Sequence, residues 1–193
     1  SEVEDWKYDI LKKYIGDKRV GAKLRDGDNR VELPFWLGSA DKITPNEPEV
    51  LERWVRDNKT PSYVITEKLD GVSCLFISER GHISIYTRGD GTIGADISYL
   101  SKYFGNKKLK EDIALRGELI MKKDTYFEKY KDVYKNPRNM VSGLISGKTQ
   151  REGIEDIDLI FYEIVGNSMP SQEEQLEKIK SLGLKTPKYE IVK

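Results

Sequence analysis

The chain has 193 residues, of which 34% are charged, yet its formal net charge is zero, and it contains one cysteine and one histidine. A chain of this length can bury a hydrophobic core and forms one or two domains. The balanced charge argues against a histone-like basic protein. The single cysteine and histidine exclude an intrachain disulfide framework and argue against a zinc site or a histidine-based triad. No apolar run approaches about 18 residues and the N-terminus lacks a signal peptide's apolar core, so no membrane segment is expected.

The first third of the chain predicts two helices separated by irregular segments. Apolar residues at helical spacing predict a short amphipathic helix that ends at Gly16. Residues 17–32 are charged and aperiodic, which indicates a loop. Residues 33–39 are apolar without helical spacing, which indicates a buried segment that leads into a glycine turn. Asn46 is a candidate cap for a second helix over residues 47–58.

A lysine stands between two predicted strands. Residues 62–65 and 72–77 are rich in β-branched and aromatic residues, which favours buried strands. A lysine beside buried strands is disfavoured unless its charge is paired or it has a chemical function. In one interpretation Asp70 neutralises Lys68. In the other, Lys68 is a nucleophile whose pKa is lowered by desolvation, Asp70 orients it, and Gly71 lets the backbone approach a ligand.

A glycine-rich loop follows a third predicted strand over residues 83–87. Its glycines stand at positions 89, 91 and 94. Such a loop either brings backbone amides close to a phosphate or reverses the chain tightly. The spacing fits the dinucleotide pattern Gly-x-Gly-x-x-Gly, but the helix of a βαβ unit is not obvious after it. A helix is expected over residues 96–104.

Residues 113–121 predict a strand with two charges, Arg116 and Glu118, in its middle. Residues two apart in a strand share a face, so Glu118 is expected to face the same pocket as Lys68. The alternative is that both charges lie on a solvated edge.

Asn136 and Pro137 predict the start of another helix. Arg138 at a helix start opposes the helix dipole, which suits an anion bound there. The remaining expected elements are a strand over 158–165, a helix over 171–182 that Ser171 and Glu174 cap, and a last strand that begins at 189.

Four motifs occur in an order and at spacings that resemble those of NAD-dependent DNA ligases. They are Lys68-Leu69-Asp70-Gly71, Thr87-Arg88-Gly89-Asp90-Gly91-Thr92-Ile93-Gly94, Leu115-Arg116-Gly117-Glu118 and Asn136-Pro137-Arg138-Asn139. The resemblance covers most of the chain and implies an α+β fold, a nucleotidyltransferase core of largely antiparallel sheets flanked by helices. Residues 1–19 resemble the C-terminal helix of the family's N-terminal domain, which binds nicotinamide mononucleotide. Residues 20–193 resemble the adenylation domain, truncated before its late motifs.

The resemblance also implies roles for single residues. Lys68 resembles the lysine that becomes adenylated, and Asp70 the carboxylate near it. Glu118 resembles a carboxylate near the ribose or the metal. The residues expected to bind the cofactor are Asp5, Tyr8, Asp9, Ser39, Leu69, Gly71, Arg88 and Glu118, and those expected to contact DNA are Arg88, Arg138 and Lys148.

Two positions depart from the family's pattern. The family usually has a glutamate, which contacts adenine, two residues before the lysine, whereas this chain has Thr66 there and Glu67 next to it. An arginine usually follows the Asn-Pro-Arg-Asn helix, and here Lys148 is the only candidate to replace it.

The resemblance implies a ligase that seals nicks in duplex DNA through a lysine-AMP intermediate, in DNA repair and replication. NAD is the expected AMP donor, Mg²⁺ the expected metal and nicked duplex DNA the expected partner. We expect a monomer in the cytoplasm of a bacterium, or in the cytoplasm or nucleus of a cell infected by a large DNA virus. The alternatives are an ATP-dependent DNA or RNA ligase, which shares Lys-x-Asp-Gly, and a non-catalytic nucleotide- or DNA-binding module.

Overall fold

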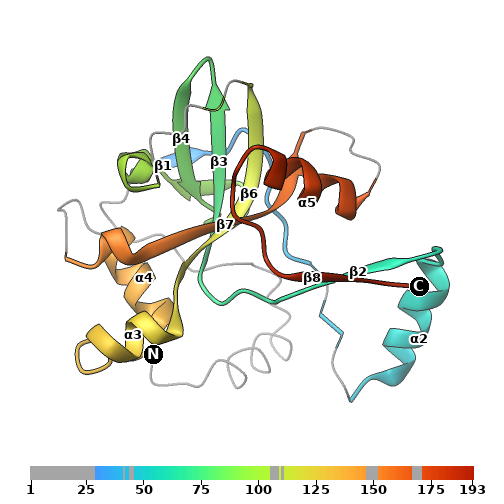
Figure 1. Cartoon of the computed structure of the whole chain (residues 1–193). Coiled ribbons are helices and arrows are strands. Elements are labelled where there is room, and N and C mark those ends of the chain that lie inside the picture. Colours follow the sequence, from blue (N-terminus) through green and yellow to red (C-terminus); the bar gives the residue numbers. More distant parts are fainter. Residues whose placement is uncertain are drawn as a thin grey trace.

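The computed structural model describes residues 29–40, 42–43, 46–104, 109, 111–146, 152–166 and 171–193 (Figure 1). Its centre is a four-stranded sheet in the order β4-β3-β6-β7, in which all neighbouring strands are antiparallel. The strands in this order span His82–Thr87, Val72–Glu79, Ile113–Met121 and Ile157–Val165. Helices flank the sheet, so the predicted α+β class with antiparallel sheets is confirmed.

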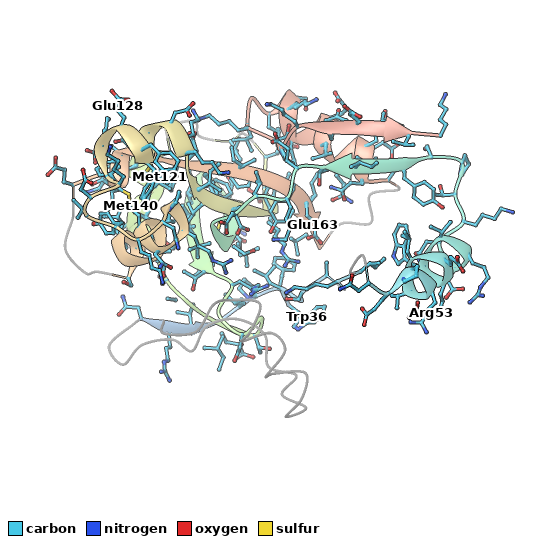
Figure 2. The ribbon with its side chains drawn as sticks, turned by 90° about the horizontal axis from the view of Figure 1, so that it is seen from below. Trp36, Arg53, Met121, Glu128, Met140 and Glu163 are labelled. Atoms are coloured by element: carbon cyan, nitrogen blue, oxygen red, sulfur yellow. The ribbon has the colours of Figure 1, made fainter. Side chains whose placement is uncertain are left out.

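One face of the central sheet carries the main hydrophobic core. Alternate residues of β3 and β6 point to this face, and Cys74, Phe76, Leu115 and Leu119 are buried there. Five described helices add apolar side chains to the same core: η1 (Ser98–Tyr103), α3 (Lys123–Lys129), α4 (Pro137–Ile145), η2 (Ile154–Asp156) and α5 (Gln172–Ser181). In Figure 2, Met121 and Met140 lie together inside this body. The residues between these core positions are therefore free to form a site on the opposite face.

A short segment covers part of that opposite face. It follows β1 (Arg30–Glu32), which pairs with β5 (Ile93–Ala95). Leu33 and Leu37 are buried against Leu75, which confirms the apolar segment as buried at these two positions. The rest of the face stays open to polar side chains.

The strand before the lysine does not join the central sheet. β2 (Tyr63–Thr66) pairs with β8 (Tyr189–Val192) in a separate two-stranded ribbon, which runs in Figure 1 toward α2 (Pro48–Asp57). The predicted burial of this strand is wrong, since Ile65 is 58% exposed. A two-stranded ribbon offers little surface against which side chains can be buried.

Most elements expected from the sequence lie within a residue or two of their predicted bounds. Of the two predicted helix caps, one is confirmed and one is wrong. Ser171 accepts a hydrogen bond from the Glu174 amide at 3.2 Å, which confirms that cap. Asn46 does not cap α2, whose N-cap is Glu47 without a side-chain bond. The helix predicted up to Gly16 lies outside the described residues. No described helix is long and apolar enough to cross a membrane.

Candidate active site

The candidate site lies where β4, β3 and β6 meet on the open face of the central sheet. The register places Ser73 opposite Glu118 and Leu75 opposite Arg116. The amide of Arg88 donates to the Ser73 carbonyl at 2.9 Å, which continues the pairing past the end of β4. Arg116 and Glu118 alternate with buried residues of β6, so the prediction that they share a face is confirmed.

The turn that carries the lysine is anchored to β6 through a glycine. A Cβ on Gly71 would lie 2.0 Å from the carbonyl oxygen of Leu119, which is far inside a normal contact. The Gly71 amide also lies near the carboxylate of Glu118 and acts to lower its pKa. The residue at position 71 must therefore be glycine for the turn to lie against the strand that carries Glu118.

Lys68 and Asp70 are exposed on this turn, and Leu69 is half-buried between them. The expectation that flanking strands bury Lys68 is wrong, because β2 is itself an open ribbon. Among the described ion pairs, Asp70 meets Arg138, with 3.5 Å between Nη1 and Oδ1. Both side chains are more than half exposed, so this pair contributes little to stability, and it does not neutralise Lys68.

Glu118 is half-buried at the centre of the site. Burial raises its pKa above the ordinary value, while the charges of Arg138, Lys68 and Arg88 and the Gly71 amide act in the opposite direction. The structure therefore brings three cations from three different segments within electrostatic range of one carboxylate. Such an arrangement can neutralise the charge of a bound phosphate while Glu118 contacts a neighbouring hydroxyl or metal.

Two arginines fasten the covering segment to the sheet. Arg88 Nη1 donates to Ser39 Oγ at 3.0 Å, and Arg116 Nη2 donates to the Gly38 carbonyl at 2.6 Å. Arg116 also pairs with Glu163 at 3.4 Å. Burial and the nearby Arg116 charge lower the pKa of Arg88, and Glu118 opposes this effect. Two guanidinium groups this close are stabilised when an anion binds between or beside them.

The glycine-rich loop is a tight reversal between β4 and β5. The amides of Thr92 and Ile93 donate to Asp90 Oδ1 at 2.9 and 2.8 Å, and the Gly91 amide donates to the Arg88 carbonyl at 2.9 Å. These donors are used within the loop, so of the two interpretations the structure favours chain reversal over a phosphate cradle. A Cβ on Gly89, whose φ is 55°, would lie 1.8 Å from the Ile93 carbonyl oxygen. Glycine is thus required there for close packing.

Tyr162 belongs to the site, although sequence reasoning missed it. A β-bulge between β6 and β7 leaves Tyr162 as an extra residue in β7. Its hydroxyl lies 3.1 Å from Ser73 Oγ and donates to Glu118 Oε2 at 3.5 Å, and burial raises its pKa. The sequence of β7 is an almost continuous apolar run that gives no sign of a bulge, so only the register reveals this contact.

Several predicted site residues lie outside the described part of the chain, namely Asp5, Tyr8, Asp9 and Lys148. At the position that departs from the family pattern, Thr66 pairs with Tyr189 in the ribbon. The carboxylate of Glu67 accepts from the Lys188 amide at 3.2 Å, so Glu67 is tied to the segment before β8.

A family model described as the NAD-dependent DNA ligase adenylation domain matches residues 42–192. The chain belongs to this family. Residues of the four motifs lie near one another in the structure, since Arg138 pairs with Asp70 and the charges of Lys68, Arg88 and Arg138 all act on Glu118. The predicted resemblance is confirmed at the level of the family.

Individual relatives are also DNA ligases by name. The DNA ligase of Acanthamoeba polyphaga mimivirus is 38% identical over all of this chain, which covers 32% of that protein. The putative DNA ligase 205R of Invertebrate iridescent virus 6 is 41% identical over 84% of this chain, which covers 26% of that protein. This adenylation-family chain therefore spans about a third or less of these two relatives. Among solved structures, a Naegleria gruberi RNA ligase K326A mutant with ATP and Mn is 14% identical to this chain, with a TM-score of 0.48. The match covers 94% of this chain and 52% of the RNA ligase chain.

Proposed function

We propose that Lys68 takes AMP from NAD and that the AMP then passes to the 5′-phosphate of a nick in duplex DNA. The observation that carries the proposal is the placement of the motif residues around Glu118. Gly71 packs against Leu119, next to Glu118 on β6, and so holds the lysine turn there. Arg88 is bonded through its amide to Ser73, which stands opposite Glu118, and Arg138 pairs with Asp70 on the lysine turn. The exposed position of Lys68 on a turn anchored by Gly71 leaves the amine open to a substrate. Membership of the NAD-dependent ligase family supports NAD as the donor.

The first step forms a bond between Lys68 Nζ and the α-phosphorus of NAD. The bond to nicotinamide mononucleotide breaks, and the amine loses its proton, so a lysine-AMP phosphoramide results. In the second step an oxygen of the DNA 5′-phosphate attacks this phosphorus and Lys68 leaves. In the third, the 3′-hydroxyl attacks the activated 5′-phosphate and AMP departs. Each step needs charge neutralisation and in-line positioning more than proton chemistry.

The other site residues supply that neutralisation and positioning. Arg88 and Arg138 bind phosphate oxygens of the nucleotide or of DNA, and Glu118 contacts the ribose. Asp70 orients the amine of Lys68, and Ser39, Leu69 and Gly71 line the nucleotide.

Mg²⁺ fits the site only as an ion held largely by substrate phosphates. The described residues contain no cluster of three or more acidic, cysteine or histidine side chains, which a site built from protein ligands alone would require. Mg²⁺ commonly takes one or two carboxylates and completes its shell with phosphates and water. Glu118 is the carboxylate that would hold it, and the ion would neutralise charge on the phosphates.

We extend the proposal to the segments outside the described residues. Residues 1–19 are the tail of a nicotinamide mononucleotide-binding domain, where Asp5, Tyr8 and Asp9 hold that half of NAD, and residues 20–193 are the adenylation domain. Lys148 adds a DNA contact after α4.

Incubation of the protein with NAD or with ATP, followed by intact-mass measurement, tests the proposal. The expected result is a mass increase of one AMP with NAD and none with ATP. AMP attachment from ATP alone would move the chain to the ATP-dependent ligases. Failure of both donors in the full-length gene product would favour a non-catalytic module.

A further inference from the structure

Trp36 is 75% exposed, although it lies in the segment whose neighbours Leu33 and Leu37 are buried. A large aromatic side chain held in water beside polar groups is a common feature of sites that bind planar ligands. In Figure 2, Trp36 lies near the middle of the view, in the irregular segment that follows β1, and the label of Glu163 stands above it. The residue belongs to the edge of the candidate site.

The backbone at Gly38 supports the indole. A Cβ on Gly38 would lie 2.0 Å from Cη2 of Trp36, so the ring rests directly on the backbone at position 38. At the ring's edge, a Cβ on Gly91 would lie 3.6 Å from its Nε1. One side of the ring is thus supported by backbone, and most of the side chain's surface is open. This is the form of a stacking platform set before a ligand arrives.

The same short segment is bound to the two site arginines. Arg116 donates to the carbonyl of Gly38, and Arg88 donates to the hydroxyl of Ser39. The flat apolar ring of Trp36 therefore stands two and three positions before Gly38 and Ser39, the residues that the two guanidinium groups bind. A ligand with a planar ring joined to a phosphate would match both features, which is the chemistry of a nucleotide.

We propose that Trp36 stacks on a nucleobase whose phosphate is bound at Arg88. The inference rests on the proposed function, because it adds a base-binding residue to the same site. The base has two sources, the adenine of NAD and a base of the nicked DNA, and both present a planar ring linked to phosphate.

The test uses Trp36→Ala, Trp36→Phe and Gly38→Ala in the full-length gene product. Binding of a fluorescent nicked duplex and the NAD concentration dependence of AMP attachment are measured for each. Loss of a base stack weakens binding by about tenfold or more, so Trp36→Ala should show this loss in one of the two assays. Trp36→Phe should retain most of the affinity. Gly38→Ala should weaken the same assay, because it displaces the ring without removing it.

The matched control is Trp54→Ala, which removes another exposed tryptophan, 41% exposed, from α2. It should leave both assays unchanged. A loss confined to the DNA assay identifies a DNA base, and a loss confined to the NAD assay identifies the adenine. Wild-type values in both assays for Trp36→Ala would overturn the inference. If AMP attachment from NAD persists in that case, the proposed function stands without it.

Discussion

Gly71 and Leu119 lie so close that a Cβ on the glycine would stand 2.0 Å from the leucine carbonyl oxygen. Through this contact the lysine turn packs against β6 at Leu119, the residue next to Glu118. The geometry of the site thus depends on backbone packing, while the pairing of Asp70 with Arg138 is an exposed contact that adds little rigidity.

Gly71→Ala should move the turn away from β6 and reduce AMP attachment by at least about tenfold, since displacement of a reacting group by about 1 Å can reduce rates a hundredfold. Overpacking of this kind also lowers the free energy of unfolding by roughly 1–3 kcal/mol. The measurements are the single-turnover rate of AMP attachment and urea unfolding.

Gly81→Ala is the control for Gly71→Ala. Gly81 has a φ of 79° in the β3–β4 turn, and a Cβ there would meet no atom within 4 Å. This variant should lose stability through backbone strain and keep the wild-type rate. Equal rates for the two variants would show that the contact at Leu119 does not position Lys68.

Arg88→Ala and Arg138→Ala should weaken binding of nicked DNA. Each phosphate contact contributes roughly one unit to the slope of log affinity against log salt, so each variant should flatten that slope by about one. Arg56→Ala, which removes an exposed arginine of α2 paired with Asp57, should leave the slope unchanged. Wild-type slopes in both site variants would assign these arginines to the structure alone.

Asp90 should stabilise the loop in a pH-dependent manner. Hydrogen bonds from the Ile93 and Thr92 amides lower the pKa of Asp90 in the folded protein. A lowered folded-state pKa gives stability that is present above the unfolded-state value of about 3.9 and is lost as the pH falls through the folded-state value.

Asp90→Asn should therefore lower Tm by about 2–4 °C at neutral pH, the range expected for one modest contact in a domain of this size. The difference from the wild type should shrink in scans below about pH 4. A difference that stays constant across this range would mean that the ionised carboxylate is not the stabilising group.

Tyr8→Ala and Asp9→Ala test the role of residues 1–19 in cofactor choice. A cationic pyridinium ring is attracted to carboxylates and to an aromatic face, so both variants should depress the reaction with NAD. They should spare the sealing of nicks that are already adenylated, because that step needs no nicotinamide. Equal losses in the two assays would indicate that the segment supports the fold.

The sequence predicted the central sheet well because its strands are rich in β-branched and other apolar residues, as in β6, which spans the predicted residues. It did not predict β1, β5 or α3, which are short or polar and are fixed by their tertiary contacts. The burial of the segment before Lys68 could not be predicted, because a β-rich run does not reveal whether its partner is a core strand or a two-stranded ribbon.

Site residues that belong to a sequence motif could be predicted. Site residues that reach the site through strand register or a backbone contact could not. The order of motifs indicated Lys68 and Glu118, and alternation placed Arg116 beside Glu118. Tyr162 reaches Glu118 because of a bulge in β7, and the ring of Trp36 is held by its contact with the backbone of Gly38. Neither relationship leaves a local pattern in the sequence.

Lys68 is the residue that we expect to carry the AMP. Peptide mapping by mass spectrometry after incubation with NAD should place one acid-labile AMP on Lys68. Lys68→Ala and Lys68→Arg should abolish the modification while the far-ultraviolet circular dichroism spectrum stays unchanged, since a guanidinium remains protonated and cannot attack. AMP found on another residue, or still attached in either variant, would contradict the account.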